Sequence, residues 1–215
     1  MPGPEASQAY QPPPAPNHIE TLATFAHQPF ANVRTNKAAG GSPVRNIKSY
    51  FFISLDGVVE APDKWHFPYF DDEMGAAVGA AFGTADAMLM GRVLYDEWAA
   101  YWPEHANEPF GDVMNSMKKY VVSNSLRTAE WQNTEIISGD VARKLTDIKA
   151  QDGGDIAMSG SATTVRWLLR AGLLDELNLL VHPIVVGNGM ARLFPPEEPS
   201  IPLKLQSAQT FKTAC

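Results

Sequence analysis

The chain has 215 residues and a net charge of −7, with 45% hydrophobic and 19% charged residues. These values are ordinary for a globular protein with a sizeable core, and the negative charge argues against a nucleic-acid or anionic-membrane surface. The sequence contains no apolar run of transmembrane length, no signal peptide and no Cys/His cluster with metal spacing. Its single cysteine, Cys215, has no internal disulfide partner. We therefore expect a cytoplasmic protein without a metal site.

Residues 1–45 differ in composition from the rest of the chain. Prolines and small polar residues dominate this region, which includes the run Pro12-Pro13-Pro14. Because such a composition cannot bury a core, we expect a disordered, Pro-rich N-terminal tail, followed by one domain over residues 46–215. A passive leader is the favoured interpretation of the tail, ahead of a proline motif that binds a partner domain.

From residue 46 onward, strand patterns alternate with helix patterns. The expected strands cover residues 48–55, 86–90, 119–123, 135–137, 155–159, 177–186 and 203–211. The expected helices cover residues 71–82, 92–101, 110–117, 140–152 and 160–171. This alternation predicts an α/β fold with helices on the faces of a mostly parallel sheet. No helix separates the last two expected strands, so we expect the C-terminal strands to be antiparallel.

A short apolar run, from Ala87 to Met90, stops at Gly91-Arg92, and a helix pattern follows at once. A buried strand that leads into a helix presents free N–H groups and the positive end of the helix dipole, and both attract phosphate. Glycine allows close backbone approach, and arginine adds a bidentate phosphate fork. Taken alone, this junction is better explained by turn and packing requirements.

Two further strand ends have the same character. Residues 159–163 (SGSAT) open a helix after one expected strand, and Ser123-Asn124-Ser125 follows another. Because the carboxyl ends of parallel strands meet at one edge of a sheet, we expect the three strand ends to converge there. Together they favour a phosphorylated dinucleotide as the ligand. The Rossmann G-x-G-x-x-G fingerprint and the G-x-S-x-G elbow of serine hydrolases are both absent from the sequence.

A loop rich in turn residues follows the first strand and is a candidate active-site lid. Trp65 in this loop could cover a planar ring. The candidate proton donors are Asp56, Glu60, Asp71 and Asp72. Each has a structural alternative: a turn at Asp56-Gly57, a helix cap at Asp71 or Asp72, and core packing for Trp65. We prefer the cap for Asp71 and Asp72.

Four segments together resemble the dihydrofolate reductase-like superfamily, and most closely the reductase domain of the bifunctional deaminase/reductases of bacterial riboflavin biosynthesis. The segments are FFISLDGVVE (51–60), KWHFPYFDDEM (64–74), ADAMLMGRVLYDEWAAYWP (85–103) and DIAMSGSATTVRWLLRAGLLDELNLLVHPIVVGNGMARLF (155–194). The resemblance implies a three-layer α/β/α fold and an NADPH-dependent oxidoreductase. Its implied activity is similar to that of 5-amino-6-(5-phosphoribosylamino)uracil reductase, and the alternative is a dihydrofolate reductase-like activity on a pteridine.

The resemblance also implies where NADPH would bind. Arg92 would lie near the adenosine 2′-phosphate, Ser123 and Asn124 would flank the ribose, and residues 159–163 would cradle the pyrophosphate. The full implied cofactor set is Ile53, Val59, Gly91, Arg92, Ser123, Asn124, Ser159, Gly160, Ser161, Ala162 and Thr163.

On the reacting side, the resemblance places Ile53, Asp56 and Val59 along the nicotinamide and the lid, and Trp65 near the substrate ring. Asp56 and Trp65 are therefore the catalytic candidates, with proton delivery either from Asp56 or from ordered water. The implied partners are a small heterocyclic substrate and a second copy of the chain, with no nucleic acid and no membrane.

Two features depart from the family pattern. The N-terminal tail lies outside it, and the sequence stops at Cys215, where relatives continue into a last strand that pairs back on the sheet. A missing strand would expose an apolar edge. For this reason a non-catalytic nucleotide-binding homologue is the competing hypothesis.

Overall fold

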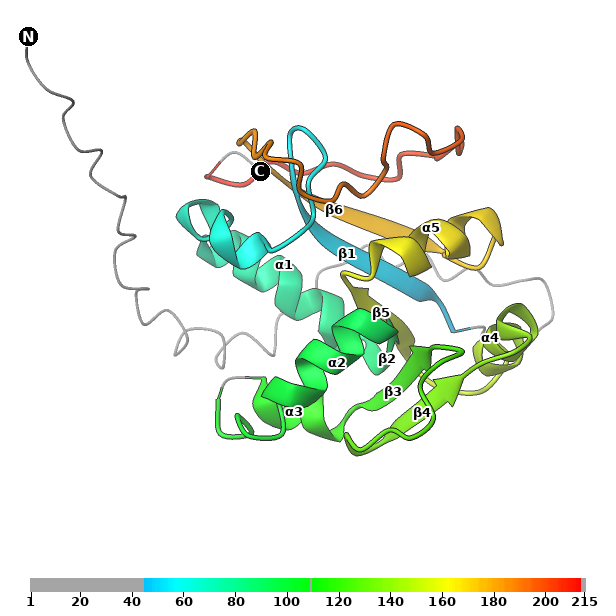
Figure 1. Cartoon of the computed structure of the whole chain (residues 1–215). Coiled ribbons are helices and arrows are strands. Elements are labelled where there is room, and N and C mark those ends of the chain that lie inside the picture. The colour runs from blue at the N-terminus through cyan, green and yellow to red at the C-terminus, as the bar shows by residue number, and fades with distance from the viewer. Residues whose placement is uncertain (1–44, 109, 214–215) are drawn as a thin grey trace, which may run out of the picture.

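The centre of the protein is a parallel sheet whose strands all run in the same direction (Figure 1). The computed structural model describes residues 45–108 and 110–213, so the predicted tail lies outside the described residues. Within them, the strands are β1 (Ile47–Ser54), β2 (Ala85–Gly91), β3 (Lys118–Val122), β4 (Thr134–Ile137), β5 (Asp155–Ser159) and β6 (Glu176–His182). Their order in the sheet is β4-β3-β2-β5-β1-β6. Every pairing between neighbouring strands is parallel.

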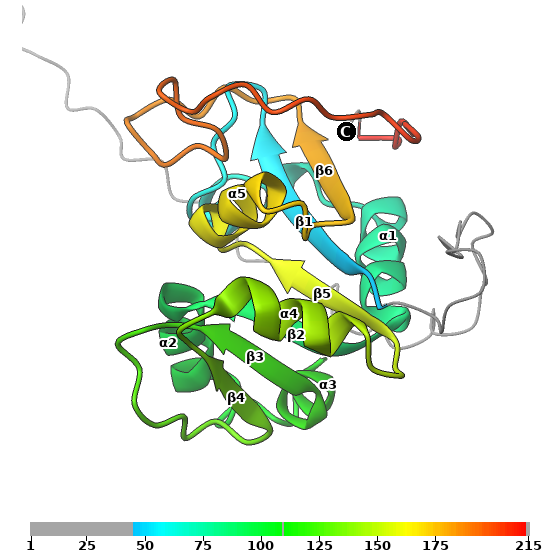
Figure 2. The same cartoon turned by 90° about the vertical axis from the view of Figure 1, so that its right-hand side faces the viewer.

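Helices cover both faces of the sheet and give the three-layer α/β/α arrangement (Figure 2). The helices are α1 (Asp72–Gly83), α2 (Arg92–Tyr101), α3 (Gly111–Ser116), α4 (Val141–Lys149) and α5 (Ala162–Arg170). Buried residues of α4 and α5, such as Leu145 and Leu168, belong to the core cluster on one face. Tyr95 of α2 and Met114 of α3 belong to a second cluster on the other face.

The sequence of β2 is apolar at successive positions because both faces of the strand are covered by helices. Ala87 and Leu89 belong to the cluster under α4 and α5, whereas Met88 and Met90 belong to the cluster under α2 and α3. Successive side chains of a strand point to opposite faces, so a strand covered on both sides needs apolar residues at every position. The continuous run that the sequence shows is therefore the signature of a central strand.

The expectation of antiparallel C-terminal strands was wrong. β6 ends at His182 because Pro183 has no amide N–H to continue a ladder. In the described residues after β6, the only antiparallel pairing is an isolated bridge between Val58 and Arg192. The expected strand 203–211 is irregular, and Leu205 within it is 80% exposed. This segment does not reach a sheet edge with which it could exchange hydrogen bonds.

The segment after β6 nevertheless returns to the body of the protein. The Thr213 hydroxyl donates to the backbone oxygen of Tyr69 (2.7 Å) and to Oδ2 of Asp71 (3.0 Å). Asp71 is the N-cap of α1, where its Oδ1 accepts from the Met74 amide at 2.8 Å. The preferred interpretation of Asp71 as a helix cap is therefore confirmed, and the same carboxylate also anchors the end of the described chain.

Candidate functional site

The three strand ends singled out in the sequence lie at one edge of the sheet and contact one another. The amide of Gly91, at the end of β2, donates to the hydroxyl of Ser161, just before α5, at 2.9 Å. Nη1 of Arg92 lies 3.4 Å from the hydroxyl of Ser125, in the loop after β3. These contacts join the β2, β5 and β3 ends, so the predicted convergence is present in the structure.

Gly91 lies where side chains from the start of α5 leave little room for a Cβ. A Cβ at this position would lie 2.8 Å from Oγ1 of Thr164 and 3.6 Å from Oγ of Ser161, both from the start of α5. The glycine therefore brings the β2–α2 junction against α5. Its own N–H is already taken by Ser161, so Gly91 shapes the site instead of offering that amide to a ligand.

The turn into α5 uses left-handed backbone. Gly160 has a φ of +70° and Ser161 a φ of +57°, a region that favours glycine and is uncommon for other residues. The Ser161 side chain makes no capping hydrogen bond to its own helix, and Gly91, the N-cap of α2, has no side chain to cap with. The first-turn amides of both helices are thus free of side-chain caps, unlike those of α1 and α4, which Asp71 and Asp140 cap.

Arg92 is the first residue of α2, and it is held by an acid one turn later. Both carboxylate oxygens of Asp96 accept from its Nε, at 2.7 and 2.6 Å. The Arg92 side chain is 40% exposed. Because Asp96 takes Nε and Ser125 lies near Nη1, the guanidinium extends from α2 towards the loop after β3.

Ser123 and Asn124 mainly organise the loop after β3. The buried hydroxyl of Ser123 accepts from the amides of Ser125 (3.2 Å) and Leu126 (3.0 Å). Oδ1 of Asn124 accepts from the amide of Gly139, after β4, at 3.3 Å. The two residues predicted to flank a ribose therefore hold this loop beside the β4 end, and the Asn124 side-chain NH₂ remains available as a donor.

The other predicted cofactor residues line the same edge with different exposure. Ile53 is buried in the cluster under α5, where Val59 and Ala162 also pack. Ser159 ends β5, and Oγ1 of Thr163 accepts from Arg166 at 3.1 Å. Val59 additionally donates its amide to Ala191 at 3.0 Å, so the start of the expected lid is pinned to the segment after β6.

Asp56 is the centre of a hydrogen-bonded turn. Its Oδ1 accepts from the Ser54 hydroxyl (2.7 Å) and the Val186 amide (3.0 Å), and its Oδ2 accepts from the Gly187 amide (3.0 Å). The hydrogen bond from Ser54, helped by those from the two backbone amides, holds the pKa of Asp56 far below its ordinary value. An ionised carboxylate has no proton to donate, so these contacts favour an anchoring role for Asp56.

Trp65 and two histidines form a buried aromatic cluster beside this turn. Trp65 donates Nε1–H to the Glu60 backbone oxygen (3.0 Å) and packs edge-on against His182, with ring centroids 5.3 Å apart. His66 stacks on Phe52 at 4.4 Å. Trp65 is 6% exposed, so in this conformation its ring serves packing and has little surface to offer a substrate.

The two histidines of this cluster are held in the neutral state. Burial lowers the pKa of His66 to about 4, and the nearby His182 ring acts in the same direction. Burial also lowers the pKa of His182, whose Nδ1 lies 2.8 Å from the Leu180 carbonyl oxygen. A buried neutral ring of this kind is typical of a structural histidine.

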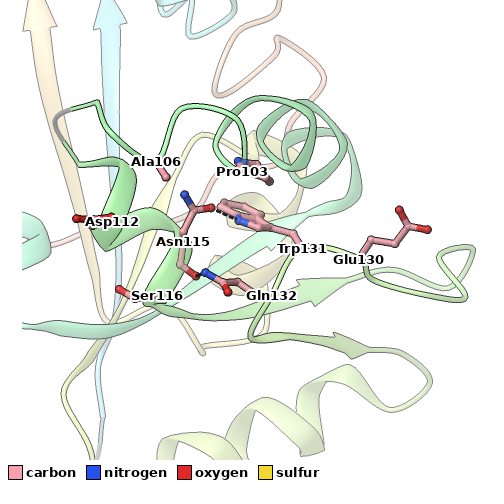
Figure 3. A pocket seen from close by; sticks show the side chains of 8 residues that line it. All are labelled: Pro103, Ala106, Asp112, Asn115, Ser116, Glu130, Trp131 and Gln132. Atoms are coloured by element: carbon pink, nitrogen blue, oxygen red, sulfur yellow. Dashed lines mark hydrogen bonds between the residues drawn. The ribbon is translucent and has the colours of Figure 1, made fainter.

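A cavity of about 560 Å³ lies away from these residues (Figure 3). It is lined by Pro103, Ala106, Asp112, Asn115, Ser116, Glu130, Trp131 and Gln132. Asn115 and Ser116 precede β3 and Trp131 and Gln132 precede β4, so the cavity opens at the edge where strands begin. Its buried polar groups pair internally, as in the 2.7 Å hydrogen bond from Trp131 Nε1 to Asn115 Oδ1. We therefore do not assign it to the candidate site.

Sequence reasoning missed several residues of the site. Ser125 was predicted only as part of a strand end, and neither Thr164 nor Asp96 was among the candidates. The i, i+4 spacing of Arg92 and Asp96 was the signal that could have found their ion pair. No local pattern could have shown that Ser161 accepts from Gly91, because the two residues are 70 positions apart.

The described residues contain neither a metal-binding cluster nor a helix suited to cross a membrane. No group of three or more His, Cys, Asp or Glu side chains in that part of the chain is arranged to hold a metal ion. Across the same residues, no helix combines the length and apolar character that a membrane crossing requires.

Two proteins of Bacillus subtilis are similar to this chain in sequence. The chain is 28% identical over 166 residues to the uncharacterized protein YyaP of Bacillus subtilis, covering 75% of this chain and 86% of YyaP. It is 24% identical over 168 residues to YwjB of the same organism, covering 77% and 91%.

Solved structures share the fold. A candidate riboflavin biosynthesis protein from Shewanella sp. PV-4 superimposes with a TM-score of 0.63 at 20% identity, covering 79% of this chain and 94% of that one. A pyrimidine reductase-like protein from Corynebacterium diphtheriae gives a TM-score of 0.53 at 12% identity, covering 79% and 88%. The model of the RibD C-terminal domain matches residues 45–215, and the chain belongs to this family.

Proposed function

We propose that this protein is an NADPH-dependent reductase of the riboflavin-biosynthesis type. The carrying observation is the edge of the sheet where α2 and α5 begin without side-chain caps and Arg92 extends between them and the loop after β3. Uncapped amides at helix N-termini suit a pyrophosphate, and an accessible guanidinium suits a further phosphate. Membership of the RibD C-terminal domain family supports the same assignment.

In this proposal each predicted residue has a binding task. The segment 159–163 and the start of α5 hold the pyrophosphate, and Arg92 holds the adenosine 2′-phosphate. Ser123 and Asn124 flank the ribose, and Ile53 and Val59 lie along the nicotinamide. NADPH, when bound, supplies a hydride from C4 of its nicotinamide ring. The acceptor would be a C=N or C=O carbon of a heterocyclic or sugar-linked substrate.

The proton that accompanies the hydride is assigned to ordered water. Asp56 accepts hydrogen bonds from Ser54, Val186 and Gly187 as a carboxylate, so it does not serve as the acid. Its task is to hold the β1 turn against the loop after β6. Trp65 acts in the same region, by packing the lid against His182.

Titration with NADPH and NADH tests the cofactor assignment. We expect NADPH to bind at micromolar concentration, and Arg92→Ala to weaken NADPH roughly tenfold to a hundredfold, the value of a hydrogen bond to a charged group, with little effect on NADH. Lys118→Ala is the matched control, because it removes one positive charge at the start of β3, the opposite edge of the sheet. Equal losses for both cofactors would remove the 2′-phosphate assignment, and no NADPH binding would end the proposal.

Turnover then separates an enzyme from a binding homologue. NADPH oxidation, followed by loss of absorbance at 340 nm, should accelerate with a pyrimidine substrate of the riboflavin route. A preference for a dihydropteridine would favour the pteridine alternative. Cofactor binding without oxidation on either substrate would favour the non-catalytic alternative. We also propose a homodimer and a cytoplasmic location, which sedimentation velocity and cell fractionation test.

A further inference from the structure

The ion pair between Arg92 and Asp96 lies at the proposed phosphate edge. Both oxygens of Asp96 contact Nε of Arg92, at 2.7 and 2.6 Å, and the two side chains are 40% and 49% exposed. Nη1 of the same guanidinium lies 3.4 Å from the hydroxyl of Ser125. The pair is therefore within reach of a ligand that enters between α2 and the loop after β3.

Asp96 affects this guanidinium in two ways. It occupies Nε, which leaves the Nη1/Nη2 edge facing the loop that carries Ser125. It also places a negative charge in direct contact with the cation, and this charge offsets part of the attraction that Arg92 exerts on an incoming anion. The first effect needs only an acceptor oxygen, whereas the second needs the charge.

We propose that Asp96 determines how strongly this site prefers a 2′-phosphorylated dinucleotide, by attenuating the charge of Arg92. The inference rests on the proposed function and names a specificity-determining residue within it. A phosphate bound to the free edge of Arg92 carries close to two negative charges at neutral pH, so it is repelled by Asp96 as well as attracted by Arg92. NADH has an uncharged 2′-hydroxyl at this place, so the charge of Asp96 should have little effect on its binding.

The size of the effect follows from Coulomb's law. We take a phosphate with two negative charges that lies roughly 6 Å from the single charge of Asp96. In a water-like dielectric at physiological salt, this repulsion changes the dissociation constant about threefold. A less polar environment raises the effect to about tenfold. Asp96→Asn removes the charge and keeps an oxygen that accepts from Nε. We therefore expect it to increase the ratio of the NADH to the NADPH dissociation constant by about threefold to tenfold, almost entirely through tighter NADPH binding.

Glu97→Gln is the matched control. Glu97 is the next residue of α2 and is exposed. Its replacement by glutamine changes the net charge by the same amount as Asp96→Asn. It should leave the ratio within about twofold of the unmodified protein, because exposed charges farther from the ligand are screened by solvent and salt. The Asp96→Asn effect should also shrink at 0.5 M salt, since it is a repulsion between solvated charges.

Both cofactors are titrated by fluorescence against the full chain and both variants, with thermal melting to check folding. A ratio that is unchanged or reduced in Asp96→Asn overturns the proposal, and so does an equal increase in Glu97→Gln. If NADPH binds the unmodified protein but the ratio does not respond, this inference fails and the proposed function stands. If neither dinucleotide binds the unmodified protein, both are refuted.

Discussion

Buried His66 should make the protein lose stability in mild acid. Its ring stacks on Phe52, lies edge-on to Phe70 and faces His182, with centroid distances of 4.4, 5.6 and 5.9 Å. Nδ1 of His66 is buried without a hydrogen-bond partner among the described residues. Protonation would place a charge in this cluster, beside a second imidazole and with no acceptor for the new N–H.

The magnitude follows from the pKa. Burial lowers the pKa of His66 in the folded protein to about 4, whereas an unfolded chain has the ordinary value of about 6.5. Between these values the unfolded chain binds a proton that the folded protein does not, so stability falls as the pH falls through this window. From pH 7 to pH 5 the linkage amounts to at most about 2 kcal/mol for this one group.

Urea unfolding at pH 7 and at pH 5 measures this loss. His66→Phe keeps an aromatic ring in the cluster but cannot be protonated, so its stability should fall by about 2 kcal/mol less than that of the unmodified protein over the same interval. His105→Phe is the control, because His105 lies on the loop after α2 with its side chain 35% exposed. An equal pH dependence in the unmodified protein and His66→Phe would refute the reasoning. The carboxylates whose pKa values the fold lowers, Asp56, Asp71 and Asp155, lose their stabilising contribution as the pH falls through their ordinary value of about 4. Most of that loss lies below pH 5 and therefore outside the compared interval.

Three further substitutions test other contacts. Gly91→Ala should lower the free energy of unfolding by about 1–3 kcal/mol, because the new Cβ would lie 2.8 Å from Thr164 Oγ1. Urea unfolding measures this loss. An unchanged free energy of unfolding would mean that the Thr164 side chain rotates away. Asp56→Ala should speed amide hydrogen exchange at Gly187, which loses its acceptor, and unchanged protection there would argue against the anchoring role. Thr213→Ala removes the two hydrogen bonds of its hydroxyl and should cost about 1 kcal/mol in the same urea experiment, whereas no loss would mean that the end of the described chain contributes nothing to stability.

The strands and helices of this fold were largely predictable because their signals are local. The run from Ala87 to Met90 indicated a buried strand, and β2 is buried on both faces. A helix was expected over residues 140–152, and α4 covers Val141–Lys149, with the Asp140 carboxylate accepting from the Arg143 amide at 3.1 Å. The strand expected over residues 177–186 was too long at its end, because β6 stops at His182, immediately before Pro183.

The segment 203–211 was mispredicted for the opposite reason. Its alternation of apolar and polar residues is typical of a strand, but a strand also needs a partner edge, and no local pattern shows whether the chain can reach one. Leu203 is 58% exposed, and the prolines that precede the segment, including Pro199 and Pro202, remove amide donors.

The location of the candidate site at this edge of the sheet was predictable from the sequence, but the contacts between its residues were not. Parallel strands bring their carboxyl ends together, so the convergence of Gly91, Ser123 and Ser159 on one edge followed from topology. The use of the Gly91 amide by Ser161 depends on how α5 packs against β2, which is a tertiary property. The role of Asp56 changed for the same reason, since its two amide donors come from the loop after β6, 130 residues away.

Helix capping gives a physical reason why an anion would bind at the N-termini of α2 and α5 and not at those of α1 and α4. The N-termini of α1 and α4 are each capped by an aspartate, so a carboxylate already accepts there and would repel a phosphate. Gly91 and Ser161 leave α2 and α5 without such a charge, because one has no side chain and the other directs its hydroxyl to Gly91. Each free N-terminus corresponds to about half a positive charge, and Arg92 adds a full one. The choice of N-cap residue thus separates α1 and α4 from α2 and α5, the two helices proposed to hold a phosphorylated ligand, and neutralising the nearby Asp96 should strengthen binding at that edge.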